Sequence, residues 1–386
     1  MVGIEHIPYD SVFPAMARLT WQQKFLQQPL QGFSLATLFK VLRQNSFQVD
    51  RQYVDKLFYL LFVATFQSVL GFFERWLLAE RIASTEVLSP PLFLLGHWRN
   101  GTTFLHNLLC QDPNHGYVRA YQALVPGSFL LPGLRELLGR FDKFIVLKTR
   151  PMDNVTYGLH EPWEDEFLMA AMTGISPYIR AMFPRIQGRE AGYKYPDFRS
   201  VEERQQWKES FGHLLKRLTV VENKRLVLKS PSHTARVKTL LELFPEAKLI
   251  HIIRHPYDVF PSNLKLWQNA LARSFFQSVT HDEIVEIVLS TYEKVYERYH
   301  KDKSYIPGSN LVEIRFEDLE RDPLAQLRNV YDYLHLPDFD VLASRVEGYL
   351  KALSNYKKNV LELAPPMKKI VRERWWQNFE VYGYDD

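Results

Sequence analysis

The amino-acid sequence predicts an α/β protein in which helices flank a parallel β-sheet, with a helical region added at the N-terminus. Three short runs of apolar and β-branched residues, centred near residues 93, 227 and 250, are typical of buried strands. Each run ends in polar residues, and helical patterns separate the runs. Strands that alternate with helices form parallel sheets through right-handed crossovers, so the polar ends of all three strands are expected at one edge.

Residues 1–89 are predicted to form the helical N-terminal region, and residues 90–386 the main domain. The two are separated by Ser89-Pro90-Pro91, because proline ends a helix and forces an extended chain into the first strand.

An uncharged stretch from Leu57 to Phe73 lies in the N-terminal region. At seventeen residues it is at the lower limit of a membrane-spanning helix, and Trp76 follows it as a residue typical of a membrane interface. The pattern fits a helix that spans a membrane, a helix over residues 57–76 that lies on a membrane surface, or a helix that packs in a core or against a partner. The sequence leaves these three alternatives open.

Composition limits the partners and the compartment. With 46% hydrophobic residues, the 386-residue chain can bury a large core. Its formal net charge of +4, with both signs interspersed, gives no indication of a nucleic-acid partner. Cys110 is the only cysteine, which excludes an intrachain disulfide, and the N-terminus lacks the pattern of a secretory signal. We therefore expect a cytoplasmic protein, with membrane association left open and the oligomeric state not indicated.

The turn after the first strand, from Gly96 to Thr103, has the features of an anion-binding loop. It connects a strand to a helical pattern, so backbone N–H groups and a helix N-terminus favour an anion there. The glycine spacing is that of a Walker-type loop, but Thr102 stands where the lysine of such loops is found, which argues against γ-phosphoryl transfer. Arg99 supplies a cation that can bind a phosphate or sulfate-like group through two hydrogen bonds. The alternative is an ordinary turn with a surface arginine.

Polar residues with catalytic chemistry follow the second predicted strand. Lys229 and Ser230 end the run Arg225 to Leu228, and His233 comes after a proline. Their place at a strand end fits a ligand site, while a structural histidine is an equally good interpretation.

The third strand also ends in a cation. Arg254 lies at its end, and Ser262 follows eight residues later, close enough for both to hold one phosphate if the segment between them turns back. A surface arginine and a helix serine are the alternative.

A dense polar segment precedes the apolar run FLMAAM, which is expected to be helical. His160 and Glu164 lie four residues apart in it, beside a glycine and a proline, and Asp165 and Glu166 follow. This pattern fits an acid/base site or an acceptor-orienting site. It fits equally well a set of acidic residues in the first turn of a helix, where the helix dipole favours them.

The C-terminal part continues with a strand over residues 311–315 and a helix over residues 324–334. The tail after residue 367 is basic and aromatic, and it predicts either a helix that docks through its tryptophans or a cationic flap over a phosphate-bearing ligand.

These motifs together resemble the sulfotransferases that use 3′-phosphoadenosine 5′-phosphosulfate (PAPS), particularly the bacterial-type families of that P-loop-like fold, over about residues 90–335. By this resemblance the loop from Gly96 to Thr103 binds the 5′-phosphosulfate, and Arg254 and Ser262 bind the 3′-phosphate. The loop residues so implied as ligands of the donor are Arg99, Asn100, Gly101, Thr102 and Thr103.

The resemblance implies transfer of a sulfuryl group from PAPS to a hydroxyl or amine of a small-molecule acceptor, with no metal. The aromatic N-terminal region favours a lipophilic acceptor. Arg99 and Lys229 are the expected charge-stabilising residues. Family members use either histidine or glutamate as the base, so His233, His160 and Glu164 all remain candidates.

This sequence departs from the family pattern in two places. Asn100 occupies a loop position that is usually serine, and the glycine-rich C-terminal loop of the animal cytosolic enzymes is absent. Asn100 and the uncharged stretch from Leu57 to Phe73 suggest the alternative function, a non-catalytic nucleotide-binding or membrane-associated protein that keeps the fold.

Overall fold

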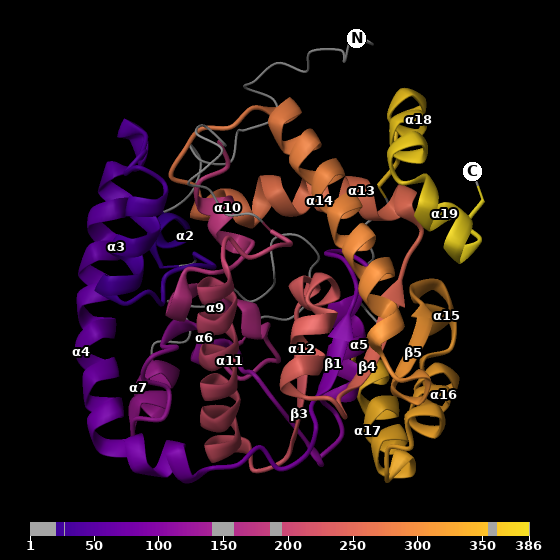
Figure 1. The fold of residues 1–386 in the computed structure, drawn as a ribbon, viewed down its shortest axis with the longest axis horizontal. Helices are drawn as coiled ribbons and strands as arrows, with labels where there is room; N and C mark the ends of the chain where they lie inside the picture. The colour runs from indigo at the N-terminus through magenta and orange to yellow at the C-terminus, as the bar shows by residue number, and fades with distance from the viewer. Residues whose placement is uncertain (1–20, 27, 141–157, 186–194, 354–360, 386) are drawn as a thin grey trace.

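The structure is a computed structural model that describes residues 21–26, 28–140, 158–185, 195–353 and 361–385. Its centre is a five-stranded sheet in which every pairing is parallel, in the order β2-β3-β1-β4-β5 (Figure 1). The strands are β1 (Leu92–Leu95), β2 (His115–Tyr117), β3 (Arg225–Lys229), β4 (Lys248–Ile253) and β5 (Leu311–Arg315). The predicted fold class is therefore confirmed, with β2 as an edge strand that the sequence pattern does not indicate.

Helices cover both faces of the sheet because successive strand residues point to opposite sides. Leu92 and Leu94 of β1 belong to a cluster with α5 (Thr102–Leu109), α16 (Pro323–Leu334) and α17 (Phe339–Ala352). Phe93 and Leu95 belong to the core on the other face. The helices that contribute to that core include α9 (Asp165–Thr173), α11 (Val201–Glu222), α12 (Val237–Leu243), α13 (Pro256–Asn269) and α14 (His281–Asp302).

Several further elements around the sheet are short. The helices are α6 (Ala120–Leu124), α7 (Leu134–Arg140), α10 (Tyr178–Met182) and α15 (Phe316–Arg321), and the single turns of 3₁₀ helix include η1 (Arg51–Tyr53), η2 (Pro231–Ala235), η3 (Leu271–Ser274) and η4 (Lys303–Tyr305). The chain after β3 thus continues as η2 and then as α12.

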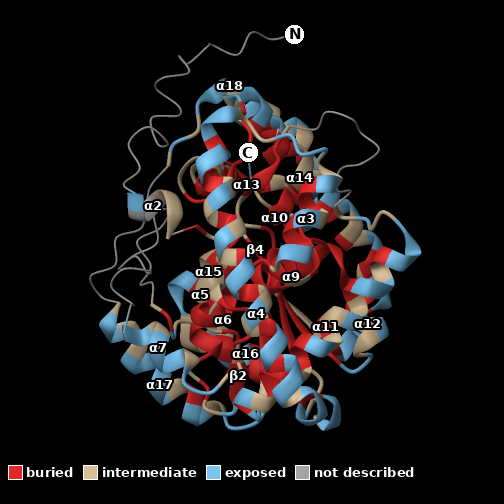
Figure 2. Ribbon diagram, turned by 90° about the vertical axis from the view of Figure 1, so that its left-hand side faces the viewer, coloured by how far each residue is buried: buried red, intermediate tan, exposed pale blue. Residues whose placement is uncertain are grey.

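The N-terminal region is helical where it is described, and its helices lie along one side of the molecule (Figure 1). They are α2 (Trp21–Phe25), α3 (Leu35–Gln44) and the 31-residue α4 (Val54–Ser84). Leu38, Val41 and Leu60 of this region pack in the same core as the sheet. The division at residue 89 stays a prediction. Figure 2 shows buried residues around the sheet and exposed residues along the outward side of α4.

The C-terminal helices α18 (Pro365–Arg374) and α19 (Trp376–Tyr382) pack against α14. The Trp375 ring stacks on Tyr292 with centroids 3.7 Å apart, and Arg374 forms ion pairs with Glu286 and Glu293. These contacts agree with a tail that docks through a tryptophan.

Candidate active site

The loop from Gly96 to Thr103, called the anion loop below, requires glycine at two positions. Gly96 has φ +143° and Gly101 has φ +93°. A Cβ atom would lie 2.6 Å from the Ile252 carbonyl oxygen at Gly96 and 2.2 Å from the Phe316 ring at Gly101. The loop can therefore pack tightly on β4 and α15, and it leads directly into α5, whose first-turn N–H groups have no acceptors within the helix.

Arg99, Arg254 and Ser262 come together beside this loop, although they lie far apart in the sequence. Arg99 adopts φ +73°, and its Nε donates to Ser262 Oγ at 2.8 Å. Arg254 Nη1 donates to the Arg99 carbonyl at 3.3 Å, and Arg254 also pairs with Asp258 at 3.2 Å. Two guanidinium groups, a hydroxyl and a helix N-terminus thus lie at one edge of the sheet, an arrangement suited to more than one anionic group.

Asn100 does not face this edge with its side chain. It is fully buried, and its Nδ2 donates to the Ile252 carbonyl at 3.1 Å and to the Tyr296 hydroxyl at 2.8 Å. Its backbone N–H donates to the His97 carbonyl at 3.1 Å. The Asn100 side chain therefore holds the loop against β4 and α14, and a contact of Asn100 with the donor stays a prediction.

Lys229 and Glu164 form an ion pair next to the anion loop. Lys229 Nζ lies 2.6 Å from Glu164 Oε1 and 3.4 Å from the Thr103 hydroxyl on the first turn of α5. The Tyr178 hydroxyl donates to Glu164 Oε2 at 2.5 Å and accepts from Trp98 Nε1 at 3.0 Å. Burial raises the pKa of Tyr178 well above its ordinary value, so this hydroxyl stays protonated as a donor.

His160 contacts Tyr121 and Arg119. Its side chain is exposed, its ring lies 6.1 Å from that of Tyr121, and its carbonyl accepts from Arg119 at 3.5 Å. A four-residue spacing places two side chains on one face only within a helix, but α9 begins at Asp165, and Pro162 pairs in an extended bridge with Arg119.

His233 is completely buried behind the site. Its Nε2 lies 2.8 Å from Asp165 Oδ2, and its ring contacts Phe93 and Phe211 edge-on, with centroids 5.3 Å and 5.6 Å apart. An imidazole enclosed in this way cannot reach an acceptor without rearrangement, so the geometry favours the structural interpretation of His233.

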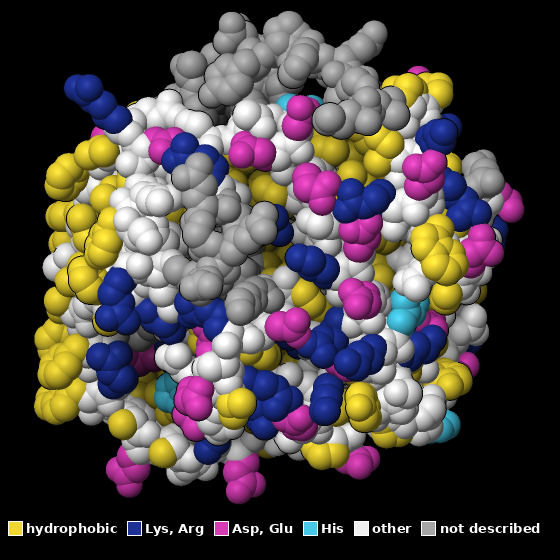
Figure 3. Space-filling model, turned by 45° about the horizontal axis from the view of Figure 1, so that its top comes forward, with side chains coloured by type: hydrophobic (Ala, Val, Ile, Leu, Met, Phe, Trp, Pro, Cys, Tyr) yellow, Lys and Arg dark blue, Asp and Glu magenta, His cyan; other side chains and the backbone are white. Residues whose placement is uncertain are grey.

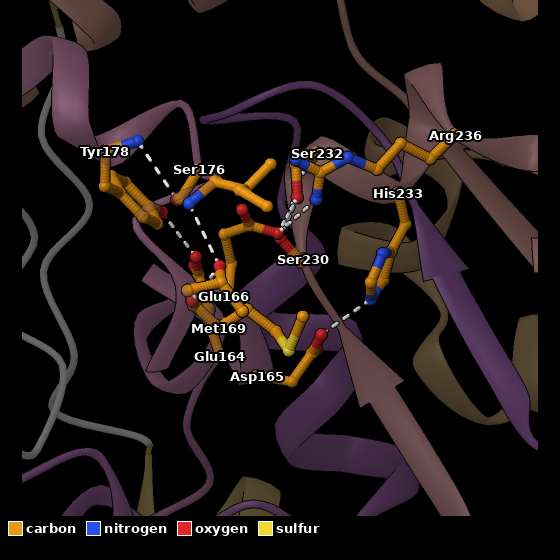
Figure 4. Close-up of polar contacts among 12 residues, drawn as sticks. Glu164, Asp165, Glu166, Met169, Ser176, Tyr178, Ser230, Ser232, His233 and Arg236 are labelled. Carbon is orange, nitrogen blue, oxygen red and sulfur yellow. Dashed lines mark hydrogen bonds and ion pairs between the residues drawn. The ribbon is translucent and has the colours of Figure 1, made fainter. Parts of the chain in front are cut away.

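Three consecutive carboxylates, Glu164, Asp165 and Glu166, which we call the acidic triplet, bind the last residue of β3 and the segment that follows it. Figure 4 shows the contacts of Asp165 with His233 and of Glu166 with Ser232 and Arg236. Glu164 pairs with Lys229, Asp165 with His233, and Glu166 with Arg236, at 2.6, 2.8 and 2.7 Å. Both segments stand out in the sequence, but their pairings do not. The only signal was three acids ahead of an apolar helix and three basic residues between positions 229 and 236.

An apolar pocket adjoins the Lys229–Glu164 pair, because Tyr178 and Trp98 also line the pocket. Its other walls come from α10, α13, η3 and α14, and its empty volume, counted out to the open mouth, is about 560 Å³. Apolar lining side chains include Leu266, Trp267, Leu271 and Val288. Burial lowers the pKa of His97 on the pocket wall to about 3, so that imidazole is neutral at physiological pH.

The fold and the site define a class of protein: a P-loop-like α/β protein that lacks the Walker lysine and carries a Lys–Glu pair beside its anion loop. The chain belongs to the sulfotransferase family, whose model matches residues 90–340. The resemblance inferred from the sequence is therefore confirmed.

Individual relatives agree with this assignment. The chain is 35% identical to the ω-hydroxy-β-dihydromenaquinone-9 sulfotransferase Stf3 of Mycobacterium bovis over 92% of this chain and 90% of that protein. Its fold is similar to that of sulfotransferase STF1 from Mycobacterium tuberculosis, with a TM-score of 0.65, 17% identity, and 92% and 93% of the two chains covered. Sulfotransferase STF9 from Mycobacterium avium gives a TM-score of 0.62 at 17% identity, covering 91% of this chain and 96% of its own.

Proposed function

We propose that this sulfotransferase takes its sulfuryl group from PAPS and transfers it to a hydroxyl group of a lipophilic small molecule. The observation that carries the proposal is the meeting of three features at one sheet edge. These are the cationic cluster of Arg99, Arg254 and Ser262, the Lys229–Glu164 pair, and the apolar pocket. The name of the relative Stf3, which specifies a hydroxylated menaquinone derivative, supports a lipophilic acceptor with a hydroxyl group.

The residues of the anion loop fit a donor with two anionic ends. The first-turn amides of α5, including those of Thr102 and Thr103, suit the 5′-phosphosulfate end. Arg254 and Ser262 suit a second phosphate, with Arg99 between the two ends because it contacts both residues. No lysine follows Gly101, which agrees with a donor that carries no γ-phosphate.

The same geometry gives each polar side chain a role in transfer. The acceptor oxygen forms a bond to sulfur while the bond between sulfur and the 5′-phosphate oxygen breaks, and the displaced oxygen gains negative charge. Lys229 Nζ, within reach of Thr103 on the anion loop, would stabilise that charge. Glu164, whose side chain is 14% exposed, would accept the proton from the acceptor hydroxyl. We therefore propose Glu164, and not His160 or His233, as the base.

We also propose that α4 lies on a membrane surface. Its inward side is attached to the body of the protein, because Glu74 pairs with Arg217 at 2.5 Å and Gln67 donates to the Leu124 carbonyl at 2.7 Å. A helix fixed in this way lies along the protein, although α4 is long and apolar enough to cross a membrane. Its outward side, the apolar face of α4, consists of Phe58, Phe62, Phe66, Val69, Phe72, Phe73, Trp76 and Leu77, each at least 45% exposed.

The apolar face of α4 is better suited to contact with a membrane surface than to exposure to water. Figure 3 shows hydrophobic side chains gathered along one edge of the molecule, on the side where α4 lies in Figure 1. Contiguous exposed apolar surface of this kind is rare on soluble monomers, and aromatic side chains favour the membrane interface. A lipid phase beside the enzyme would also hold a lipophilic acceptor.

The function is tested by incubating the protein with PAPS that carries a radiolabelled sulfuryl group and a panel of alcohols, phenols and hydroxylated lipids. We expect label to move to lipophilic hydroxyl compounds. Binding of the donor without label in any acceptor would favour the alternative of a non-catalytic nucleotide-binding protein. Tight binding of ATP with phosphoryl transfer would overturn the donor assignment.

A further inference from the structure

Arg180 is a charged residue in the wall of the apolar pocket. It belongs to α10, and its side chain is partly buried among the aromatic and aliphatic lining side chains. Its Nη1 donates to the Thr291 hydroxyl at 3.4 Å, a long hydrogen bond, and its Nε is buried with no hydrogen-bond partner among the described residues. The described part of the protein therefore satisfies the guanidinium group only in part.

The nearby carboxylate is bound elsewhere. Glu286 on α14 influences Arg180 electrostatically, but its two oxygens accept from Arg374 at 3.0 Å and 3.1 Å. No carboxylate of the described residues lies within ion-pair distance of Arg180. Burial lowers the pKa of Arg180 to about 10, so the group still carries its charge at neutral pH. A buried cation without a carboxylate is costly for the protein unless a ligand compensates it.

Two polar groups line the pocket together with its apolar walls. Tyr178 and Trp98 connect it to Glu164, the proposed base. Arg180 and Thr291 form a hydrogen bond between α10 and α14. Apolar side chains such as Trp267 and Leu271 form walls of the same pocket. An acceptor that fills it would therefore present a hydroxyl towards Glu164, an apolar body along the walls, and a hydrogen-bond-accepting group towards Arg180.

We infer that Arg180 binds an oxygen atom of the acceptor, either a carboxylate or a carbonyl, and so selects amphiphilic acceptors that carry this group apart from the hydroxyl that receives the sulfuryl group. The inference rests on the proposed function and deepens it. A guanidinium that meets a ligand oxygen in a dry pocket makes a charge-assisted hydrogen bond, which is among the stronger polar contacts.

The test compares three acceptors of equal chain length: an ω-hydroxy fatty acid, its methyl ester, and the plain primary alcohol, each in a series of chain lengths. The acid carries an anion, the ester a neutral carbonyl, and the alcohol neither. For the wild type we expect kcat/KM to be about tenfold higher or more for the acid, the ester or both than for the alcohol. If the enzyme prefers the acid alone, Arg180 requires an anionic group on the acceptor. If it prefers both the acid and the ester, Arg180 binds any oxygen that accepts a hydrogen bond.

Two variants separate selection from general damage to the pocket. Arg180→Met should bring the ratio of kcat/KM for the preferred compound and the alcohol close to one, and Arg180→Lys should restore part of it. Val288→Ala, which shortens an apolar wall residue, should lower kcat/KM for all three acceptors together. The ratio of kcat/KM for the preferred compound and the alcohol should stay that of the wild type. Binding of adenosine 3′,5′-bisphosphate confirms that each variant is folded.

The inference is overturned if the wild type does not distinguish the three compounds, or if Arg180→Met retains the preference. These outcomes differ from failure of the proposed function, in which no acceptor receives label. In that case quenching of the fluorescence of Trp98 and Trp267 by the same compounds still tests the role of Arg180, because both indoles line the pocket. Equal affinity of wild type and Arg180→Met for the acid and the ester would then overturn it.

Discussion

Glu164 is the candidate base that the structure brings to the anion loop. Its two oxygens contact Lys229 and Tyr178, and part of its side chain reaches solvent. His233 lies between two phenylalanine rings with no exposed surface, and His160 points out from a turn. A general base must come within hydrogen-bond reach of the proton that it accepts, and Glu164 best meets this requirement.

Replacement of Glu164 by glutamine should lower kcat by about a hundredfold or more, because the amide cannot accept the acceptor proton. The measurement is turnover with the labelled donor, together with titration of adenosine 3′,5′-bisphosphate, whose affinity should change little. Glu161→Gln removes a neighbouring carboxylate that lies outside the pair with Lys229 and serves as the matched control. If His160→Ala or His233→Ala abolished turnover while Glu164→Gln kept it, the assignment of the base would be wrong.

Arg254 should discriminate between nucleotides by their 3′-phosphate. The wild type is expected to bind adenosine 3′,5′-bisphosphate at least about tenfold more tightly than adenosine 5′-phosphate, since a charge-assisted hydrogen bond contributes about 1.5–3 kcal/mol. Arg254→Ala should reduce this preference by a similar factor, measured by calorimetry. Arg345→Ala, an exposed arginine on α17, is the control. An Arg254→Ala protein with an unchanged preference would contradict the assignment of the 3′-phosphate site.

At the scale of elements, α4 combines an attached inward side with an exposed aromatic outward side. Phe62 and Phe66 are 62% and 57% exposed at the middle of its apolar face. The double variant Phe62→Glu/Phe66→Glu should lose about tenfold or more of its binding to phosphatidylcholine vesicles, because carboxylates on this face cannot insert at the boundary with the acyl chains as the phenylalanine rings do. Co-sedimentation with vesicles measures this effect.

The control for α4 is Val201→Glu, which places the same charge at a position that is 79% exposed on α11. Its vesicle binding should equal that of the wild type. The alternative is that the apolar face of α4 joins two copies of the chain. In that case the wild type would not bind vesicles but would form dimers with increasing concentration, and the Phe62→Glu/Phe66→Glu variant would stay monomeric.

Strands β4 and β5 are linked by the carboxylate of Glu313, which contacts His251 Nδ1 at 3.0 Å, the Tyr299 hydroxyl at 2.8 Å and Lys303. Burial alone would raise the pKa of Glu313, but these partners lower it to about 2. A carboxyl with a lowered pKa stabilises the fold above its unfolded pKa of ~4.5, and this contribution is lost as the pH falls towards 2.

The free energy of unfolding of the wild type should therefore fall between pH ~4.5 and ~2 by about 1–2 kcal/mol more than that of Glu313→Gln, after allowance for solvent screening. Urea denaturation over this pH range measures the difference. Glu347→Gln, at an exposed position on α17, should follow the wild-type profile. Parallel profiles for the wild type and Glu313→Gln would contradict this account of the link between β4 and β5.

For the whole molecule, the sequence predicts the central sheet because Leu92, Val227 and Ile250 lie in continuous apolar runs. Such runs are typical of parallel strands that are buried on both faces. Strand β2 could not be predicted because it has only three residues, one of them glycine. It is a strand because it pairs with β3. Local pattern carries no information on a strand that depends on its neighbour.

The candidate site could be predicted as far as parallel topology determines it. Arg99 and Arg254 end neighbouring strand units, so their proximity follows from the order of the strands. The pairing of the acidic triplet with Lys229, His233 and Arg236 depends on how α9 docks on the segment after β3, and no local pattern specifies that long-range packing. The apolar pocket could not be predicted for the same reason, since the anion loop, α10, α13, η3 and α14 all contribute to its lining.

One contact joins the proposed membrane-facing helix to the pocket. Lys56, at the start of α4, is almost fully buried, and its Nζ donates to the carbonyls of Arg273 and Phe275, the latter at 3.0 Å. Arg273 lies in η3, whose Leu271 lines the pocket. The helix proposed to meet lipid is therefore attached directly to an element of the pocket wall.

The apolar face of α4 should therefore affect turnover only when the acceptor is held in a bilayer. With a long-chain alcohol in vesicles, Phe62→Glu/Phe66→Glu should lower kcat/KM by about tenfold, because the enzyme no longer concentrates at the lipid surface. With a short, water-soluble alcohol the same variant should stay within about twofold of the wild type. Val201→Glu should match the wild type in both assays. An equal loss with both acceptors would mean that α4 acts through folding of the pocket and not through lipid.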